Sequence, residues 1–334
     1  MARPPKTTRD QVVRRFEGFC PNETNRPTVV KFMMDIYDRF KRDGLADRAF
    51  DSQLVGIDDD QFQQRISELL LAHWLWEDGF TLSSANQGPD FKASKGDRFV
   101  WIELVTPLPT TDVLRDYVRP LEYQKIHVRS VPSEELKLKW LSALDAKRQQ
   151  MEQHIQAGIV GPDDPYVIAV NKRMLDRNNF DVDGISQQPL PVELGFGFGP
   201  KIVQIDKTTL KSVSSGYQHV ESITKSTTGS AVEASLYLLP GYQRVSGIFG
   251  IALHNRRPFG DQFPSALAYN PFAKVPLPRR LIGATQHWSG EWANNVWIPF
   301  PLHPVVRGYA REEGLRTILW LVVEPGQLPR CPLV

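Results

Sequence analysis

Apolar residues recur at helical spacing in three segments of the chain. In residues 28–41 and 59–79 they fall three and four positions apart, and Gly79 supplies a stop signal for the second segment. This spacing is typical of amphipathic helices with one face in the core. A third helix is predicted over residues 133–156, with Ser133 as its N-cap and two glutamates in its first turn.

Continuous apolar runs predict buried strands between and after these helices. Residues 99–105 (Phe-Val-Trp-Ile-Glu-Leu-Val) and 166–170 (Tyr-Val-Ile-Ala-Val) are rich in β-branched and aromatic side chains, which suits strands buried on both faces. Residues 90–93 are predicted to pair with 99–105 as a β-hairpin, after a short strand at 80–85. The order is therefore helix, three strands, helix, strand, and its last crossover implies a parallel pairing.

The second half of the chain is richer in predicted strands. Strands are expected at residues 230–238 and 244–253, joined by Pro240-Gly241, and at residues 315–323. The segment 254–304 is rich in proline, tryptophan and asparagine and is predicted to be irregular.

These patterns divide the chain into three regions. Residues 1–60 form an N-terminal helical lead in which 44–60 is predicted to be a loop, residues 61–175 form the core, and residues 176–334 are either a second domain or an extension of the core sheet. The glycine-rich run 195–199 does not lie between a strand and a helix, so we reject a nucleotide-binding loop there.

Composition narrows the class of protein. The 334 residues are 41% hydrophobic and 23% charged, as in soluble globular proteins, and the net charge of +2 gives no overall basic field. Cys20 and Cys331 lack metal-ligand spacing and suggest a reducing compartment, and neither a membrane span nor a secretion signal is evident, so a cytoplasmic protein is expected. The basic residues among positions 1–15 predict a solvated tail that runs into a helix near Asp10, with a phosphate-binding arm as the alternative.

One carboxylate interrupts the apolar strand at 99–105. Glu103 in a buried strand is costly unless it is paired or bound to a cation. Hairpin pairing can bring it close to Asp90, and two converging carboxylates make a candidate divalent-cation site. Two plainer interpretations stay open: Asp90 as an ordinary turn residue, and Glu103 facing solvent from an edge strand.

The helix at 59–79 carries two further polar side chains of interest. Glu68 lies among apolar neighbours just before the hairpin, so it is a candidate third acid. His73 is predicted to be a histidine at the edge of the core rather than a metal ligand.

A helix glutamate, an aspartate after proline and a glutamate in a buried strand, in this element order, resemble the PD-(D/E)XK nuclease superfamily. The residues are Glu68, Pro89-Asp90 and Glu103-Leu104-Val105, and the resemblance covers residues 60–171. It implies an α/β fold with a restriction-endonuclease-like αβββαβ core and helices flanking a mixed sheet. It also implies that Asp90 and Glu103, assisted by Glu68, hold Mg²⁺ (or Mn²⁺) in an endonuclease that hydrolyses phosphodiester bonds, in DNA.

The chain departs from the superfamily pattern at Val105, which occupies the lysine position. Valine can neither donate a hydrogen bond nor stabilise a hydroxide. Some members of the superfamily supply the amine from the following helix, and Lys147 in the predicted helix 133–156 is the candidate for that role. Lys92 and Lys95 in the hairpin are the other candidates, and a Lys147 that snorkels to solvent is the plain alternative.

Three functions therefore stay open. The first is a metal-dependent nuclease, possibly homodimeric. The second is a catalytically degenerate nuclease-like module that binds nucleic acid or a protein partner, and the third is an unrelated α/β protein in which Glu103 is a satisfied core acid. Basic and aromatic residues of the C-terminal half offer phosphate contacts and stacking in the first two, or simple packing: Arg256, Arg257, Lys274, Arg279, Arg280, Trp288, Trp292 and Trp297.

Overall fold

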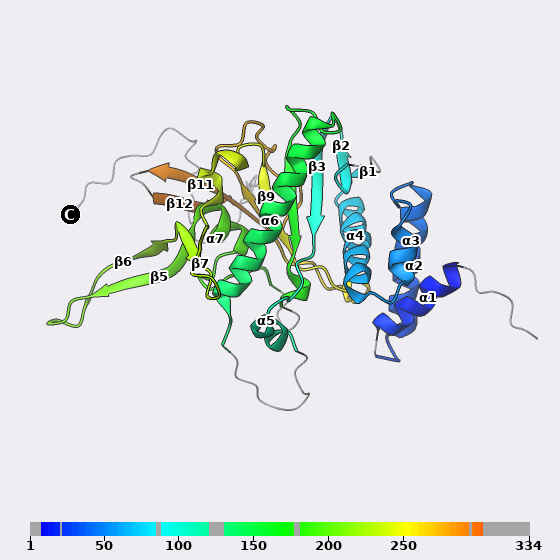
Figure 1. The fold of residues 1–334 in the computed structure, drawn as a ribbon, viewed down its shortest axis with the longest axis horizontal. Coiled ribbons are helices and arrows are strands. Elements are labelled where there is room, and N and C mark those ends of the chain that lie inside the picture. The colour runs from blue at the N-terminus through cyan, green and yellow to red at the C-terminus, as the bar shows by residue number, and fades with distance from the viewer. Residues whose placement is uncertain are drawn as a thin grey trace, which may run out of the picture. The chain divides into compact units, whose positions relative to one another are not determined.

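The computed structural model describes residues 8–20, 22–84, 88–119, 130–176, 181–293 and 296–302. Within these residues the chain is a mixed α/β protein with one eight-stranded mixed sheet and helices on both of its faces (Figure 1). The strand order in the sheet is β1-β2-β3-β4-β9-β10-β11-β12.

Four N-terminal helices cover one face of the sheet (Figure 1). They are α1 (Thr8–Phe19), α2 (Arg26–Arg42), α3 (Phe50–Val55) and α4 (Asp59–Glu77). Asp58 caps α4 by accepting hydrogen bonds from the next turn. The prediction of a loop over 44–60 was wrong, because helix α3 lies within it and buries Phe50 and Leu54. The helix has only 6 residues, too few for a helical period to be visible in the sequence.

The predicted hairpin is present and is preceded by a short strand. Strand β1 is Thr81–Ser83, β2 is Phe91–Lys95 and β3 is Arg98–Val105, with β2 and β3 antiparallel. Gly96 in the turn has φ +64°, a conformation that glycine adopts without a steric penalty. The centre of β3 is buried on both faces, as predicted.

The crossover that follows β3 is also as predicted. Helix α6 (Ser133–Gln156) leads to β4 (Tyr166–Asn171), which pairs parallel to β3, and a short helix α5 (Asp112–Tyr117) lies between β3 and α6. One detail was wrong: the N-cap of α6 is Pro132, without a side-chain cap, rather than Ser133.

Later strands continue the same sheet beyond β4. Strand β9 (Gly247–Ile251) pairs parallel to β4, and β10 (Ser265–Tyr269), β11 (Gln286–Ala293) and β12 (Val296–Pro301) follow. The prediction that residues 254–304 are irregular was therefore wrong. Strand β10 is short, β11 mixes polar residues with Gly290, and β12 contains two prolines. Pairing with neighbours supplies the order that the local pattern does not indicate.

The predicted pair of strands around Pro240-Gly241 is also corrected. Strand β8 (Ala231–Glu233) pairs with β7 (Ser222–Thr224) in a separate two-stranded sheet, not with β9. Two short 3₁₀ turns, Leu236–Leu238 and Pro240–Tyr242, lie in the connection from β8 to β9. Two others, Lys172–Met174 and Arg257–Phe259, follow β4 and β9.

A second two-stranded sheet follows α7 (Leu190–Phe196). It consists of β5 (Phe198–Ile205) and β6 (Ser212–His219). The glycine run 195–199 joins α7 to β5, which agrees with our rejection of a nucleotide-binding loop.

Side-chain alternation along β3 sets up two cores and orients Glu103. Val100, Ile102 and Leu104 pack with the N-terminal helices, whereas Trp101 packs on the opposite face with α6 and α7. Because successive side chains of a strand point to opposite faces, Glu103 shares the α6 face with Trp101.

Several predictions concern the ends of the chain. The strand expected at 315–323, Cys331 and residues 1–7 of the basic tail lie outside the described residues. Helix α1 confirms the helix predicted near Asp10, and its Arg9 and Arg15 form ion pairs with Asp38 and Asp59.

None of the helices in the described ranges is both long enough and apolar enough to cross a lipid bilayer.

Candidate functional site

Glu103 on β3 and Lys147 on α6 form an ion pair that is largely buried. Only 5% of Glu103 is exposed, and its Oε1 accepts a hydrogen bond from Lys147 Nζ at 2.6 Å. Strand β3 lies between β2 and β4, so the solvent-facing edge position considered for Glu103 is wrong. The predicted placement of Lys147 over the sheet is confirmed, and its side chain is 19% exposed rather than extended into water.

Asp90 lies beside Glu103 at the end of the hairpin. The β2–β3 register pairs Phe91 with Ile102, and one step further places Asp90 opposite Glu103. Asp90 Oδ2 accepts a hydrogen bond from the Leu104 amide at 2.7 Å. Burial and the charge of Glu103 raise the pKa of Asp90 to about 7, although Lys147 opposes this shift. We call Asp90 and Glu103 the hairpin acid pair; our expected separation of about 4–6 Å between their nearest oxygens stays a prediction.

Glu68 on α4 is the third acid of this region. Burial and the charge of Asp90 raise the pKa of Glu68 to about 8. Arg65 Nη1 donates to Glu68 Oε2 at 2.8 Å, and Arg65 also contacts Asp47 at 2.8 Å. The guanidinium thus occupies one oxygen of Glu68 and links this acid, through Asp47, to the segment between α2 and α3.

Electrostatics make the hairpin acid pair respond to a cation. Burial raises the pKa of Glu103, and its contact with Lys147 only partly offsets that effect. Burial alone would lower the pKa of Lys147, but Glu103 and Asp90 outweigh it and raise this pKa. Added positive charge would therefore favour the ionised form of both acids.

Two aromatic residues complete the surroundings of Glu103 and were missed by the sequence reasoning. Tyr166 donates to Glu103 Oε2 at 3.4 Å, and His154 Nε2 lies 3.9 Å from the same oxygen. Burial raises the pKa of Tyr166, so the phenol stays protonated, whereas burial and then Lys147 lower the pKa of His154. The position of His154, seven residues after Lys147 on one helix stripe, was the available signal.

The two other lysines considered for the amine contact different groups. Lys92 Nζ lies 4.2 Å from the centre of the Phe99 ring, and Lys95 donates to Asp78 at 3.0 Å. The packing of both side chains therefore leaves Lys147 as the amine that contacts the hairpin acid pair.

The donor chemistry of the hairpin acid pair suits a hard divalent ion, which prefers carboxylate oxygens. Within the described part of the chain, however, no three His, Cys, Asp or Glu side chains are grouped as a set that could hold a metal. The residues therefore fit a divalent ion held by two carboxylates, those of Asp90 and Glu103, because Glu68 is bound by Arg65.

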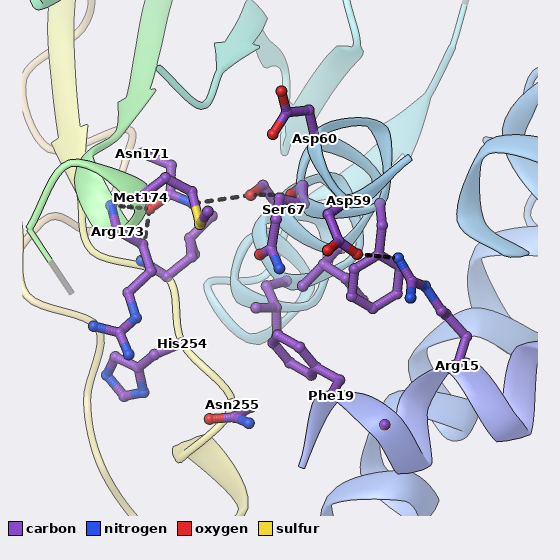
Figure 2. Close-up of a pocket in the computed structure, with 16 residues that line it drawn as sticks. Arg15, Phe19, Asp59, Asp60, Ser67, Asn171, Arg173, Met174, His254 and Asn255 are labelled. Atoms are coloured by element: carbon purple, nitrogen blue, oxygen red, sulfur yellow. Dashed lines mark hydrogen bonds and ion pairs between the residues drawn. The ribbon is translucent and has the colours of Figure 1, made fainter. Parts of the chain in front are cut away.

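A separate cavity of about 590 Å³ lies at the carboxyl ends of β4 and β9 (Figure 2). Its lining does not include Asp90, Glu103 or Lys147. Figure 2 shows Arg15 bonded to Asp59 on one side and Asn171 bonded to Ser67 on another.

Two buried polar side chains that line this cavity, Asn171 and His254, already make hydrogen bonds within the protein. Asn171 donates to Ser67 at 2.9 Å and accepts from the Leu253 amide at 3.1 Å. His254 accepts from the Arg256 amide at 3.2 Å through Nδ1, which leaves Nε2–H to donate to Gln262. Sequence reasoning missed both, although Asn171 ends one buried strand and His254 closely follows another. The bonds of Asn171 link the end of β4 to α4 and to the segment just after β9.

The predicted edge position of His73 is confirmed: it is half-buried and packs edge-on against Phe32, with ring centres 4.9 Å apart.

Trp297 and Arg257 of the C-terminal half are engaged in core packing and in an ion pair. Trp297 is 5% exposed and lies edge-on to Phe196 at 4.9 Å, and Trp288 and Trp292 are half-buried. Arg257 pairs with Glu77 at 2.8 Å. For Trp297 the core-packing interpretation is confirmed.

Comparison of the chain with protein-family models, curated proteins and solved structures finds no match.

Proposed function

We propose that this protein is a divalent-metal-dependent nuclease that hydrolyses phosphodiester bonds in DNA, built on a restriction-endonuclease-like core. The observation that carries the proposal is the 2.6 Å contact between Lys147 and Glu103 beside Asp90. Val105 leaves the hairpin without the amine that such a site needs, and α6 brings one to the same carboxylate.

Each side chain then has a chemical task. Asp90 and Glu103 would hold Mg²⁺ or Mn²⁺, which when bound supplies positive charge that polarises the phosphate. The Lys147 ammonium favours ionisation of an attacking water and stabilises the negative charge that develops on the phosphate oxygens. Tyr166, which donates to Glu103 Oε2, holds the carboxylate in place.

A second candidate function has its own support. Lys147 is an internal counter-ion for Glu103, so this acid is satisfied without a metal, and three acids do not converge among the described residues. A degenerate site of this kind would leave a module that binds nucleic acid or a protein partner without cleaving it.

Cleavage of supercoiled plasmid and linear duplex DNA tests the proposal directly. The parent should cut with Mg²⁺ or Mn²⁺ and not with EDTA, and Glu103→Gln and Asp90→Asn should abolish cutting while the fold is retained. Asp97→Asn, an exposed acid in the turn of the same hairpin, is the matched control and should cut like the parent. Cutting by Glu103→Gln at the parent rate would refute the assignment, and a parent that binds DNA but never cuts it would favour the degenerate module.

A further inference from the structure

The β5–β6 hairpin, residues 198–219, forms an arm that extends away from the sheet and the helices (Figure 1). Its two strands pair only with each other in the described part of the chain. From Pro200 to Gln218 every residue except Asp206 is exposed. An isolated two-stranded hairpin is marginally stable in water, so an arm of this length is best explained by a partner that it grips.

Charge on the arm favours an anionic partner. Lys201, Lys207 and Lys211 are exposed along it. Asp206, its single acid, is engaged within the tip, where it accepts hydrogen bonds from the Thr208 and Thr209 amides at 2.8 and 2.6 Å. Neutral hydrogen-bonding side chains of the kind that contact phosphate and sugar also line the arm, alongside exposed apolar ones: Gln204, Thr208, Thr209, Ser212, Ser214, Ser215 and Gln218.

The tip presents an apolar side chain between two of these lysines. Leu210 is 79% exposed and has φ +56°, in the left-handed region that bulky residues avoid. Hydrogen bonds from the Leu210 amide to the Asp206 carbonyl and from the Asp206 amide to the Lys211 carbonyl, at 2.8 and 2.9 Å, close the turn in this form. The local structure thus holds a leucine in water at the end of the arm.

We propose that the arm binds duplex DNA, with Leu210 inserted as a wedge at a base step and Lys207 and Lys211 on the flanking phosphates. Apolar wedges of this type unstack a step from the minor groove and bend the duplex, and Lys contacts to phosphate position the protein. The inference rests on the proposed function, because it makes the arm the element that holds and bends the nuclease substrate.

A second copy of this chain is a weaker candidate for the partner. Two such arms would repel each other, because each carries three lysines and a single acid that is hydrogen-bonded within the tip. The exposed apolar side chains are also divided between the two faces of the hairpin, because Ile202 and Val203 are adjacent in β5 and point to opposite sides; each is 47% exposed. A self-complementary dry interface would need them on one side.

Duplex binding by the full chain in EDTA, where the proposed cleavage is blocked, tests the arm. Fluorescence anisotropy should show that Lys207→Gln/Lys211→Gln weakens duplex affinity about tenfold and lowers the salt slope by about 2. Leu210→Ala should abolish duplex bending in an end-labelled energy-transfer assay, with affinity changed less. Lys225→Gln, an exposed lysine between β7 and β8, is the matched control and should bind and bend DNA like the parent.

The outcomes separate the arm from the nuclease proposal. Unchanged affinity of the double variant, or a parent without duplex affinity, overturns the arm proposal. If the double variant binds like the parent and the parent cuts DNA with metal, the nuclease proposal is supported and the arm proposal is refuted. Loss of binding and bending in the variants, with a parent that never cuts, supports the arm and refutes the nuclease. A parent dimer that Leu210→Ala dissociates without affecting DNA would assign the arm to a second copy instead.

Discussion

Replacing Asp90 by asparagine should change how protein stability depends on pH in metal-free buffer. The folded pKa of Asp90 is about 7, whereas an unfolded aspartate has a pKa of about 3.9. The folded state therefore binds this proton more tightly, so its stabilising effect is complete below the unfolded pKa and is lost as pH rises through the folded pKa.

The magnitude follows from the width of that window. Between pH 5 and pH 8 the unfolded aspartate is ionised, whereas the folded acid keeps its proton until about pH 7. The free energy of unfolding therefore falls by about 1.4 kcal/mol per pH unit below pH 7, and by about 3 kcal/mol over the whole window. The asparagine side chain would be neutral throughout and can still accept the hydrogen bond from the Leu104 amide. The free energy of unfolding of Asp90→Asn should therefore fall less than that of the parent between pH 5 and pH 8, by about 3 kcal/mol.

Urea unfolding followed by tryptophan fluorescence, with EDTA present at both pH values, measures this difference. Asp97→Asn on the exposed turn of the hairpin should follow the parent. If Asp90→Asn also follows the parent to within about 0.5 kcal/mol, the charge of Asp90 is not penalised by the fold and the electrostatic account of the hairpin acid pair is wrong.

Three further outcomes follow from the same contacts. Saturating Mn²⁺ at pH 8 should raise the melting temperature of the parent but not of Asp90→Asn, and equal shifts in both would place the ion elsewhere. Lys137 Nζ lies 2.6 Å from Glu193 Oε2, so Lys137→Met would leave Glu193 as a buried unpaired charge. The variant should lower the free energy of unfolding by about 3–5 kcal/mol, and a loss below about 1 kcal/mol would contradict this. Asn171→Ala should cost about 2–3 kcal/mol, because the buried Leu253 amide loses its acceptor, and a neutral effect on urea unfolding would show that another acceptor replaces it.

The core elements could be predicted because their sequence patterns are long. The buried runs that became β3 and β4 admit few alternatives, and the 24-residue helix α6 between them requires a parallel return. Helix α3 and strand β10 were missed because they are short, β11 because polar residues and Gly290 interrupt it, and β12 because it contains prolines. Their order comes from packing and pairing with distant segments rather than from local propensity.

The candidate site was predictable to the extent that it is local. Hairpin register alone brings Asp90 opposite Glu103, and the stripe of α6 that carries Lys147 is visible as a spacing. Tyr166 was not predictable as a partner of Glu103, because their contact depends on the register of β3 against β4. The Arg65–Glu68 pair is an i, i+3 contact that sequence could have suggested, but its competition with a metal role emerges only with Asp47 in place.

Single-turnover cleavage of duplex DNA by Lys147→Met tests the central claim most directly. The substitution keeps the apolar stem and removes the charge that contacts Glu103. With Mn²⁺ present, and with melting temperature checked for each protein, the rate should fall by about 10² or more while DNA and metal affinity change little, because the amine acts mainly in the transition state. Lys139→Met, on the same helix but bonded to Thr110, should cut like the parent. A folded Lys147→Met that cuts at the parent rate would contradict the account.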